Sequence, residues 1–161
     1  MASKLGVETI SHTNNTTALE IDSSGRVTLP KVPACVGIFT SITTTQSGDT
    51  ICGLSDSATY GFSNGGLTID TTNHKLVVPV TGVYRVSAQR LTSGTSGIYF
   101  QIKHEGSNVA QAYASGPDHT DMTVTTLLDC AANDEIQFNY NGAVTYAWSG
   151  QHAIFAAELV G

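Results

Sequence analysis

Charge is scarce in this chain of 161 residues: aspartate, glutamate, lysine and arginine together make up 12% of it. Only seven residues are lysine or arginine, they are scattered, and the formal net charge is −6. Proteins that bind nucleic acid neutralise phosphates with clustered basic side chains, so we expect no nucleic-acid partner. No apolar run approaches the ~20 residues that a membrane-spanning helix needs, so we expect no membrane partner. The first residues also lack the apolar segment of a secretory signal peptide.

Cysteine is rare as well, with only Cys35, Cys52 and Cys130. An odd number of widely spaced cysteines does not form a disulfide framework. We therefore expect three buried free thiols in a protein made in a reducing cytoplasm.

Metal-ligand motifs are missing too. There is no Cys-x-x-Cys and no His-x-x-x-His, and the five histidines stand alone. Asp118 and Asp121 offer oxygen ligands to a hard cation, but a solvated turn is the simpler interpretation. The same holds for the acidic group Asp129, Asp134 and Glu135. We predict no catalytic residues, no metal site and no cofactor, and a protein that is not an enzyme.

The sequence is instead rich in threonine, serine, glycine and asparagine. Its apolar residues alternate with polar ones, a pattern with a period of two. In residues 135–140, for example, Ile136, Phe138 and Tyr140 alternate with polar residues, which is typical of a strand with one buried face. Asn64-Gly65-Gly66 and Asn141-Gly142 mark turns between such segments. We expect an all-β, two-sheet antiparallel sandwich or jelly roll of eight or nine short strands. The clearest strands are expected at 76–80, 82–89, 98–103, 122–128, 135–140 and 153–160.

The first 32 residues differ from the rest. Residues 1–18 are polar, and residues 18–30 then predict a β-hairpin around the turn at 22–25. A hairpin alone is marginally stable in water, so it must pack against a partner. We expect an N-terminal arm at 1–32 that serves assembly, followed by one domain at 33–161. The arm would dock through its alternating apolar residues Leu19, Ile21, Val27 and Leu29.

Residues 33–161 resemble the jelly-roll domain of the C1q/TNF superfamily. The resemblance rests on four segments, 33–39, 71–87, 127–136 and 153–159, of which Leu76-Val77-Val78-Pro79-Val80-Thr81-Gly82-Val83-Tyr84 is the most recognisable. It implies a homotrimer. By position in the family, it implies a trimer interface formed by Phe39, Met122, Val124 and Phe155.

The segment 18–34, Ala-Leu-Glu-Ile-Asp-Ser-Ser-Gly-Arg-Val-Thr-Leu-Pro-Lys-Val-Pro-Ala, is similar to the lead-in of many tailed-phage virion and tail-fibre proteins, those of marine phages (cyanophage type) especially. This likeness implies a virion structural protein. We expect a trimeric capsid decoration (cement) protein on the virion surface, assembled in the host cytoplasm and bound to the major capsid protein or another virion protein.

A second hypothesis is a receptor- or glycan-binding knob of a tail fibre or head appendage. Tyr146, Trp148 and His152 follow the Asn141-Gly142 turn, and exposed aromatic rings of this kind stack on sugars. The partner would then be a glycan of the host surface. Packing in the core or in the trimer interface is the other interpretation of these aromatic residues.

Overall fold

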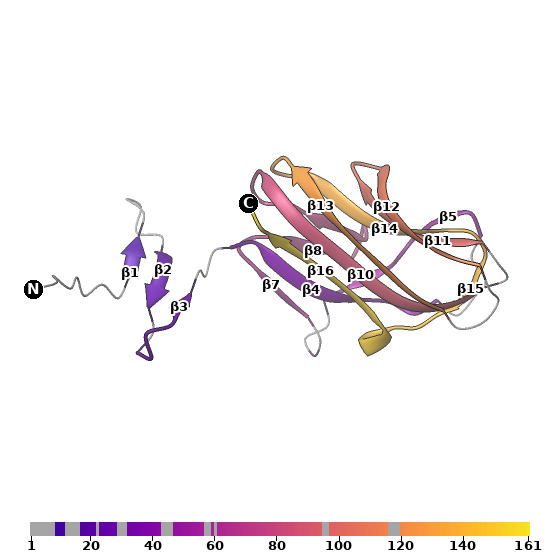
Figure 1. Ribbon diagram of the computed structural model, residues 1–161, viewed down its shortest axis with the longest axis horizontal. Helices are drawn as coiled ribbons and strands as arrows, with labels where there is room; N and C mark the ends of the chain where they lie inside the picture. The colour runs from indigo at the N-terminus through magenta and orange to yellow at the C-terminus, as the bar shows by residue number, and fades with distance from the viewer. Residues whose placement is uncertain are drawn as a thin grey trace, which may run out of the picture. The chain divides into compact units, whose positions relative to one another are not determined.

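The computed structural model describes residues 9–11, 17–21, 23–28, 32–42, 47–56, 59, 61–94, 97–115 and 120–161. The chain divides into two compact units, Met1–Val32 and Pro33–Gly161. Both are built from strands (Figure 1), and within the described residues the one helical element is a 3-10 turn, η1 (Gly150–His152).

The N-terminal unit is a three-stranded antiparallel sheet in the order β1 (Thr9–Ser11), β2 (Thr17–Ile21) and β3 (Val27–Thr28). Ile21 pairs with Val27, which confirms the predicted hairpin. Gly25 has a φ of 76°, a conformation that glycine adopts without a steric penalty, so the turn closes at the expected residue. The pairing of β1 with β2 was not predicted, because β1 lies in the polar stretch at 1–18.

The second unit consists of two antiparallel sheets packed face to face (Figure 1), as the alternating pattern predicted. The seven-stranded sheet has the order β13 (Thr120–Cys130), β10 (Gly82–Gly94), β16 (Ala153–Leu159), β4 (Ala34–Phe39) and β6 (Leu54–Ser55), with β15 (Val144–Ala147) on β10 and β7 (Phe62–Asn64) on β4. The six-stranded sheet has the order β12 (Ser107–Ala114), β11 (Ile98–His104), β14 (Glu135–Asn141), β9 (Lys75–Val77) and β8 (Thr68–Asp70), with β5 (Asp49–Ile51) on β14.

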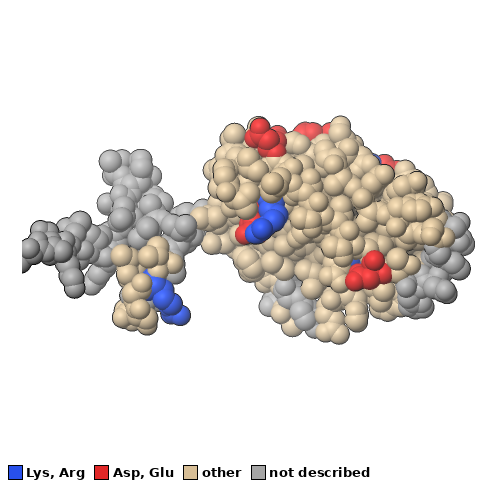
Figure 2. Space-filling model, in the orientation of Figure 1, with Lys and Arg blue, Asp and Glu red and all other residues tan. Residues whose placement is uncertain are grey.

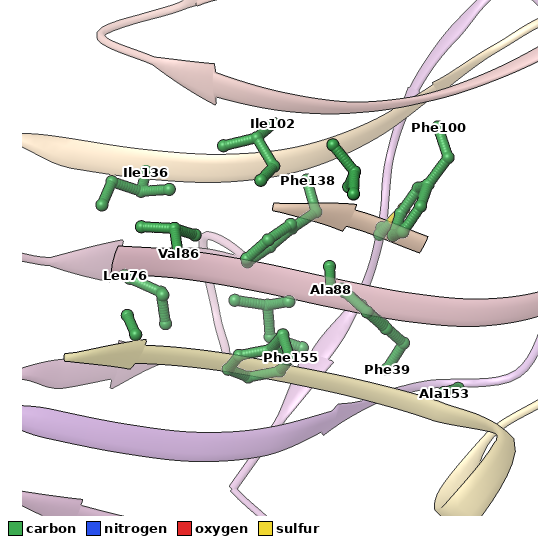
Figure 3. Packing of buried hydrophobic residues seen from close by; sticks show 14 of the residues in the cluster. Phe39, Leu76, Val86, Ala88, Phe100, Ile102, Ile136, Phe138, Ala153 and Phe155 are labelled. Atoms are coloured by element: carbon green, nitrogen blue, oxygen red, sulfur yellow. The ribbon is translucent and has the colours of Figure 1, made fainter. Parts of the chain in front are cut away.

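The core lies between the sheets and is centred on aromatic rings (Figure 3). The ring centroid of Phe39 lies 5.2 Å from those of Phe138 and Phe155, and 5.7 Å from that of Phe100. A Cβ atom on Gly37 would collide with the Phe155 ring, so glycine is required at this position of β4. Ring pairs at such distances add stabilisation beyond the burial of their apolar area.

One charged residue is part of this core. Arg90 of β10 has no exposed surface, and its guanidinium lies 5.1 Å from the Phe39 ring centroid and 5.5 Å from that of Tyr140. It donates a hydrogen bond to the carbonyl oxygen of Thr40. The aromatic faces thus replace part of the hydration that the buried cation loses.

The second unit has more strands than the eight or nine expected, and β9 and β12 show why the expectation differs. The strand expected at 76–80 ends at Val77 as β9, because Pro79 has no N–H, and Val78 bonds instead to Asn133 and Asp134 of the turn that precedes β14. β12 was not expected. It is an edge strand whose larger apolar side chains, Val109 and Tyr113, are exposed, so no buried apolar face marked it.

Candidate functional site

The four residues expected at a trimer interface lie in the core instead. Phe39 and Phe155 have no exposed surface within the single chain, and Met122 and Val124 are 2% and 6% exposed. A side chain that its own chain already buries has no surface left to bury against a second copy. The prediction is therefore corrected: these four residues hold the two sheets together.

The opposite face of the same sheet is open and almost free of charge. Ser87 and Gln89 of β10 stand beside Thr125 and Thr123 of β13 on one side, and beside Ala156 and Ile154 of β16 on the other. These side chains are exposed or half-buried, and a shallow hollow lies among them. Figures 1 and 2 share an orientation in which β10 and β16 run across the viewer's side, and uncharged residues fill the middle of this side. We call these six residues the open face.

The ends of the open face are marked by a few charged and apolar residues. Arg85 bonds to Glu158 with its Nε at 2.8 Å from Oε1. Asp121 accepts a hydrogen bond from Gln89 at 2.9 Å. Leu127 is 62% exposed beside Arg85 in the strand register. One large apolar side chain, Leu127, is thus exposed beside the uncharged open face.

The outer side of the six-stranded sheet is different, because its polar groups bond to one another. The Lys103 ammonium forms an ion pair with Asp49, and Asp49 also accepts a hydrogen bond from Asn139 Nδ2 at 3.0 Å. Gln101 donates to Gln111 across the β11–β12 pair at 3.1 Å. Lys103 and Asn139 hold the pKa of the Asp49 carboxyl below its ordinary value, so this carboxylate stays ionised.

The predicted arm residues are only partly described. Leu19 is in β2, Ile21 is half-buried at the end of β2, and Val27 is 58% exposed in β3. Leu29 lies outside the described residues. The hairpin therefore presents at least one large apolar side chain, Val27, to its surroundings.

Two of the three residues of the predicted ligand patch are in contact. The rings of Tyr146 in β15 and Trp148 pack edge to face with centroids 4.4 Å apart. Tyr146 is 37% exposed, Trp148 is half-buried, and its backbone N–H donates to Leu91 at 3.2 Å. His152 is exposed in η1. The patch is therefore one supported aromatic pair with an exposed histidine nearby in sequence.

The predicted acidic residues have different surroundings in the structure. Asp118 lies outside the described residues, and Asp121 is exposed in β13. Asp129 is also exposed, whereas Asp134 turns toward His104, with Nε2 and Oδ2 2.7 Å apart. This contact was missed because His104 and Asp134 are 30 residues apart in the chain.

The three cysteines are free and buried, as expected. Burial raises the pKa of the Cys35 and Cys52 thiols to about 12. Burial, together with neighbouring carboxylates, raises the pKa of the Cys130 thiol to about 11. Unless a metal or another group displaces the proton, all three are neutral thiols near pH 7.

Comparison with known proteins finds similarity in structure but not in sequence. No protein-family model matches the chain, and no curated protein matches it either. A solved structure, "Structure of Eiger TNF from S. frugiperda", is similar with a TM-score of 0.65 and 14% sequence identity, covering 81% of this chain and 94% of that one. In the described part of the chain, no helix has the length and apolar character to cross a membrane. The chain is thus an all-β protein with a TNF-like jelly-roll fold.

Proposed function

We propose that this protein is a non-enzymatic virion structural protein of a tailed phage, a homotrimeric capsid decoration protein that attaches through its N-terminal unit. The observation that carries the proposal is the division of the chain into a jelly roll and a separate small sheet. A unit of 32 residues is too small to bury a stable core without help, and Val27 is exposed in it. Such a unit is suited to pack on another protein.

The open face is the proposed contact between copies. It is flat and uncharged in its middle, and its threonine, serine and alanine side chains allow a second sheet to approach closely. The resemblance to the C1q/TNF superfamily implies a trimer, and three copies would cover this face and Leu127 around a three-fold axis. Many weak attachments of such trimers then sum to a strong reinforcement of the shell.

Two measurements on the purified full-length chain test the proposal. Light scattering should give a mass about three times the 16.9 kDa of the chain. The protein should also sediment, saturably, with particles of the encoding phage from which its gene has been deleted. Val27→Asp should abolish this sedimentation and leave the trimer intact, whereas Ser23→Asp, in the turn of the same hairpin, should retain it. A monomer in solution, or a Val27→Asp protein that binds like the wild type, would contradict the proposal.

The aromatic pair supports a second candidate function, a glycan- or receptor-binding knob. Tyr146 and Trp148 hold each other edge to face, so a sugar ring would meet a fixed aromatic surface. A glycan array should then give a signal with the wild type and none with Trp148→Ala. An array without any signal would remove this candidate and leave the first one standing.

A further inference from the structure

Three potential metal ligands meet at one end of the jelly roll. His104 is the last residue of β11, Cys130 is the last residue of β13, and Asp134 immediately precedes β14. One donor atom of each residue, an imidazole nitrogen, the thiol sulfur and a carboxylate oxygen, lies within 4.8 Å of the other two. The three side chains come from three strand ends that are far apart in the sequence and adjacent in the fold.

The backbone around this cluster is well fixed. Asn133 adopts a φ of 74° in the turn between β13 and β14, and its N–H donates to Val78 at 2.7 Å. Val78 in turn donates to the Asp134 carbonyl at 3.0 Å, and the Ala131 N–H donates to Asp134 Oδ2 at 2.9 Å. The Asp134 side chain is therefore positioned by hydrogen bonds before any ligand arrives, which lowers the entropic cost of binding.

The surroundings of the cluster favour a cation. Three carboxylates, those of Asp134, Asp129 and Glu105, lie near the Cys130 thiol. Asp134 Oδ2 lies 2.7 Å from His104 Nε2 and accepts a hydrogen bond from the Ala131 N–H at 2.9 Å. A divalent cation would offset this local excess of negative charge.

We propose that His104, Cys130 and Asp134 bind one zinc ion, with water as the fourth ligand. Zinc accepts nitrogen, sulfur and oxygen donors in a tetrahedron, whereas calcium and magnesium take oxygen donors alone. Tetrahedral zinc places N and O donors about 3.3 Å apart and S and N donors about 3.6 Å apart. To reach this geometry, His104 Nε2 and Asp134 Oδ2, now 2.7 Å apart, separate by roughly 0.6 Å. The Cys130 sulfur, which lies within 4.8 Å of both, moves toward them by at most about 1.2 Å.

Binding requires two proton movements besides this displacement. His104 Nε2 gives up the hydrogen that it shares with Asp134, and the neutral imidazole then carries its hydrogen on Nδ1. The Cys130 thiol loses its proton to solvent and binds as thiolate, so that thiolate and carboxylate together balance the two charges of the ion. The His104 and Asp134 side chains are each 21% exposed, which gives the ion access from solvent. The zinc would join the ends of β11 and β13 to the turn before β14. This inference does not depend on assembly into trimers.

Cobalt in place of zinc gives the most direct test, on full-length protein without an affinity tag and treated first with a chelator. One equivalent of Co²⁺ should produce a thiolate-to-cobalt charge-transfer band in the near ultraviolet and intense visible bands of a tetrahedral ion. Zinc should displace the cobalt. Zinc at one hundred times its dissociation constant should also raise the unfolding temperature by about 5–10 °C.

Three variants separate metal binding from a purely structural contact. Cys130→Ser should abolish the charge-transfer band, whereas Cys35→Ser, at a buried thiol three strands away in the same sheet, should retain it. His104→Gln retains a donor for Asp134 but removes the imidazole, so it should weaken cobalt binding at least about tenfold. Circular dichroism checks that each variant is folded.

A contact between His104 and Asp134 that serves structure alone gives different results. The wild type would then show no charge-transfer band and no thermal shift with zinc, or both would persist in Cys130→Ser and His104→Gln. Either outcome overturns the proposal. Because the measurements use the isolated protein, they stand apart from the particle-binding experiment, and each proposal can fail without the other.

Discussion

The outer sides of the two sheets carry different kinds of polar side chain. On the six-stranded sheet, long polar side chains bond to one another, as Asp49 does with both Lys103 and Asn139. On the seven-stranded sheet, the open face carries short side chains such as Ser87 and Thr125. One side carries a network in which long polar side chains bond to one another, and the other carries short side chains around a shallow hollow.

We propose that this difference separates a side that faces solvent from a side that a partner covers. Long charged side chains tied into a network would lose both hydration and bonds if another protein displaced them. Short hydroxyl side chains lose little conformational entropy on contact and let two backbones come close. The proposed contact between copies is therefore the seven-stranded sheet, and the following predictions test it.

The largest effect is expected from a charge placed on the open face. Thr125→Arg should convert the trimer to a monomer, since the contact would bury a guanidinium without a carboxylate partner. Light scattering should show the mass falling to that of a single chain, 16.9 kDa. Thr68→Arg, a matched change in β8 of the other sheet, should remain trimeric. If both variants stay trimeric, the open face is not the contact.

A smaller effect is expected from breaking the network on the six-stranded sheet. Asp49→Ala leaves the Lys103 ammonium and the Asn139 amide without their acceptor, and Lys103 is only 14% exposed. Urea unfolding should give a loss of about 1–3 kcal/mol, the cost of leaving partly buried donors unsatisfied. The oligomeric state should not change. If Asp49→Ala loses the trimer, then the six-stranded sheet takes part in the contact between copies, which contradicts the proposal.

The same network predicts a dependence of stability on pH. Because Lys103 lowers the pKa of folded Asp49, the carboxylate contributes stability that is complete above its unfolded pKa and is lost as the pH falls through its folded pKa. The difference in unfolding free energy between the wild type and Asp49→Asn should therefore be constant near neutrality and shrink below about pH 4. A difference that grows on acidification would contradict this.

The smallest effect is expected at the ion pair beside the open face. The Arg85 and Glu158 side chains are 55% and 47% exposed, and exposed ion pairs contribute little. A double-mutant cycle with Arg85→Ala and Glu158→Ala should give a coupling of about 0.2–1 kcal/mol. It is best measured in the Thr125→Arg background, so that assembly does not contribute. A coupling well above this range would show that the pair is less hydrated than its exposure indicates.

The alternating pattern of the sequence predicted the main strands well, for a physical reason. Where a strand has one buried face, every second residue must be apolar, as at Ile136, Phe138 and Tyr140, all fully buried. The pattern shows that a face is buried but not what buries it. The interface predicted for Phe39 and Phe155 came from their position in the C1q/TNF family, and the pattern alone could not show that their own chain covers them.

The candidate sites were harder to predict, because they depend on pairing between distant strands. Four of the six residues of the open face are serine, threonine or glutamine, which in sequence look like any solvated side of a strand. His104 meets Cys130 and Asp134 only because β11 and β14 are neighbours and the β13–β14 turn folds back beside them. Only a correct strand register for β11 with β14, and for the β13–β14 turn beside them, would have predicted this cluster from the sequence.

The three buried thiols can serve as probes of local opening of the structure. A neutral thiol without access to solvent does not react with an alkylating reagent, so each cysteine becomes reactive only while the structure around it is open. Cys35 lies in β4, Cys52 lies between β5 and β6, and Cys130 ends β13. Labelling rates at the three positions would therefore distinguish fraying of one strand from cooperative separation of the two layers.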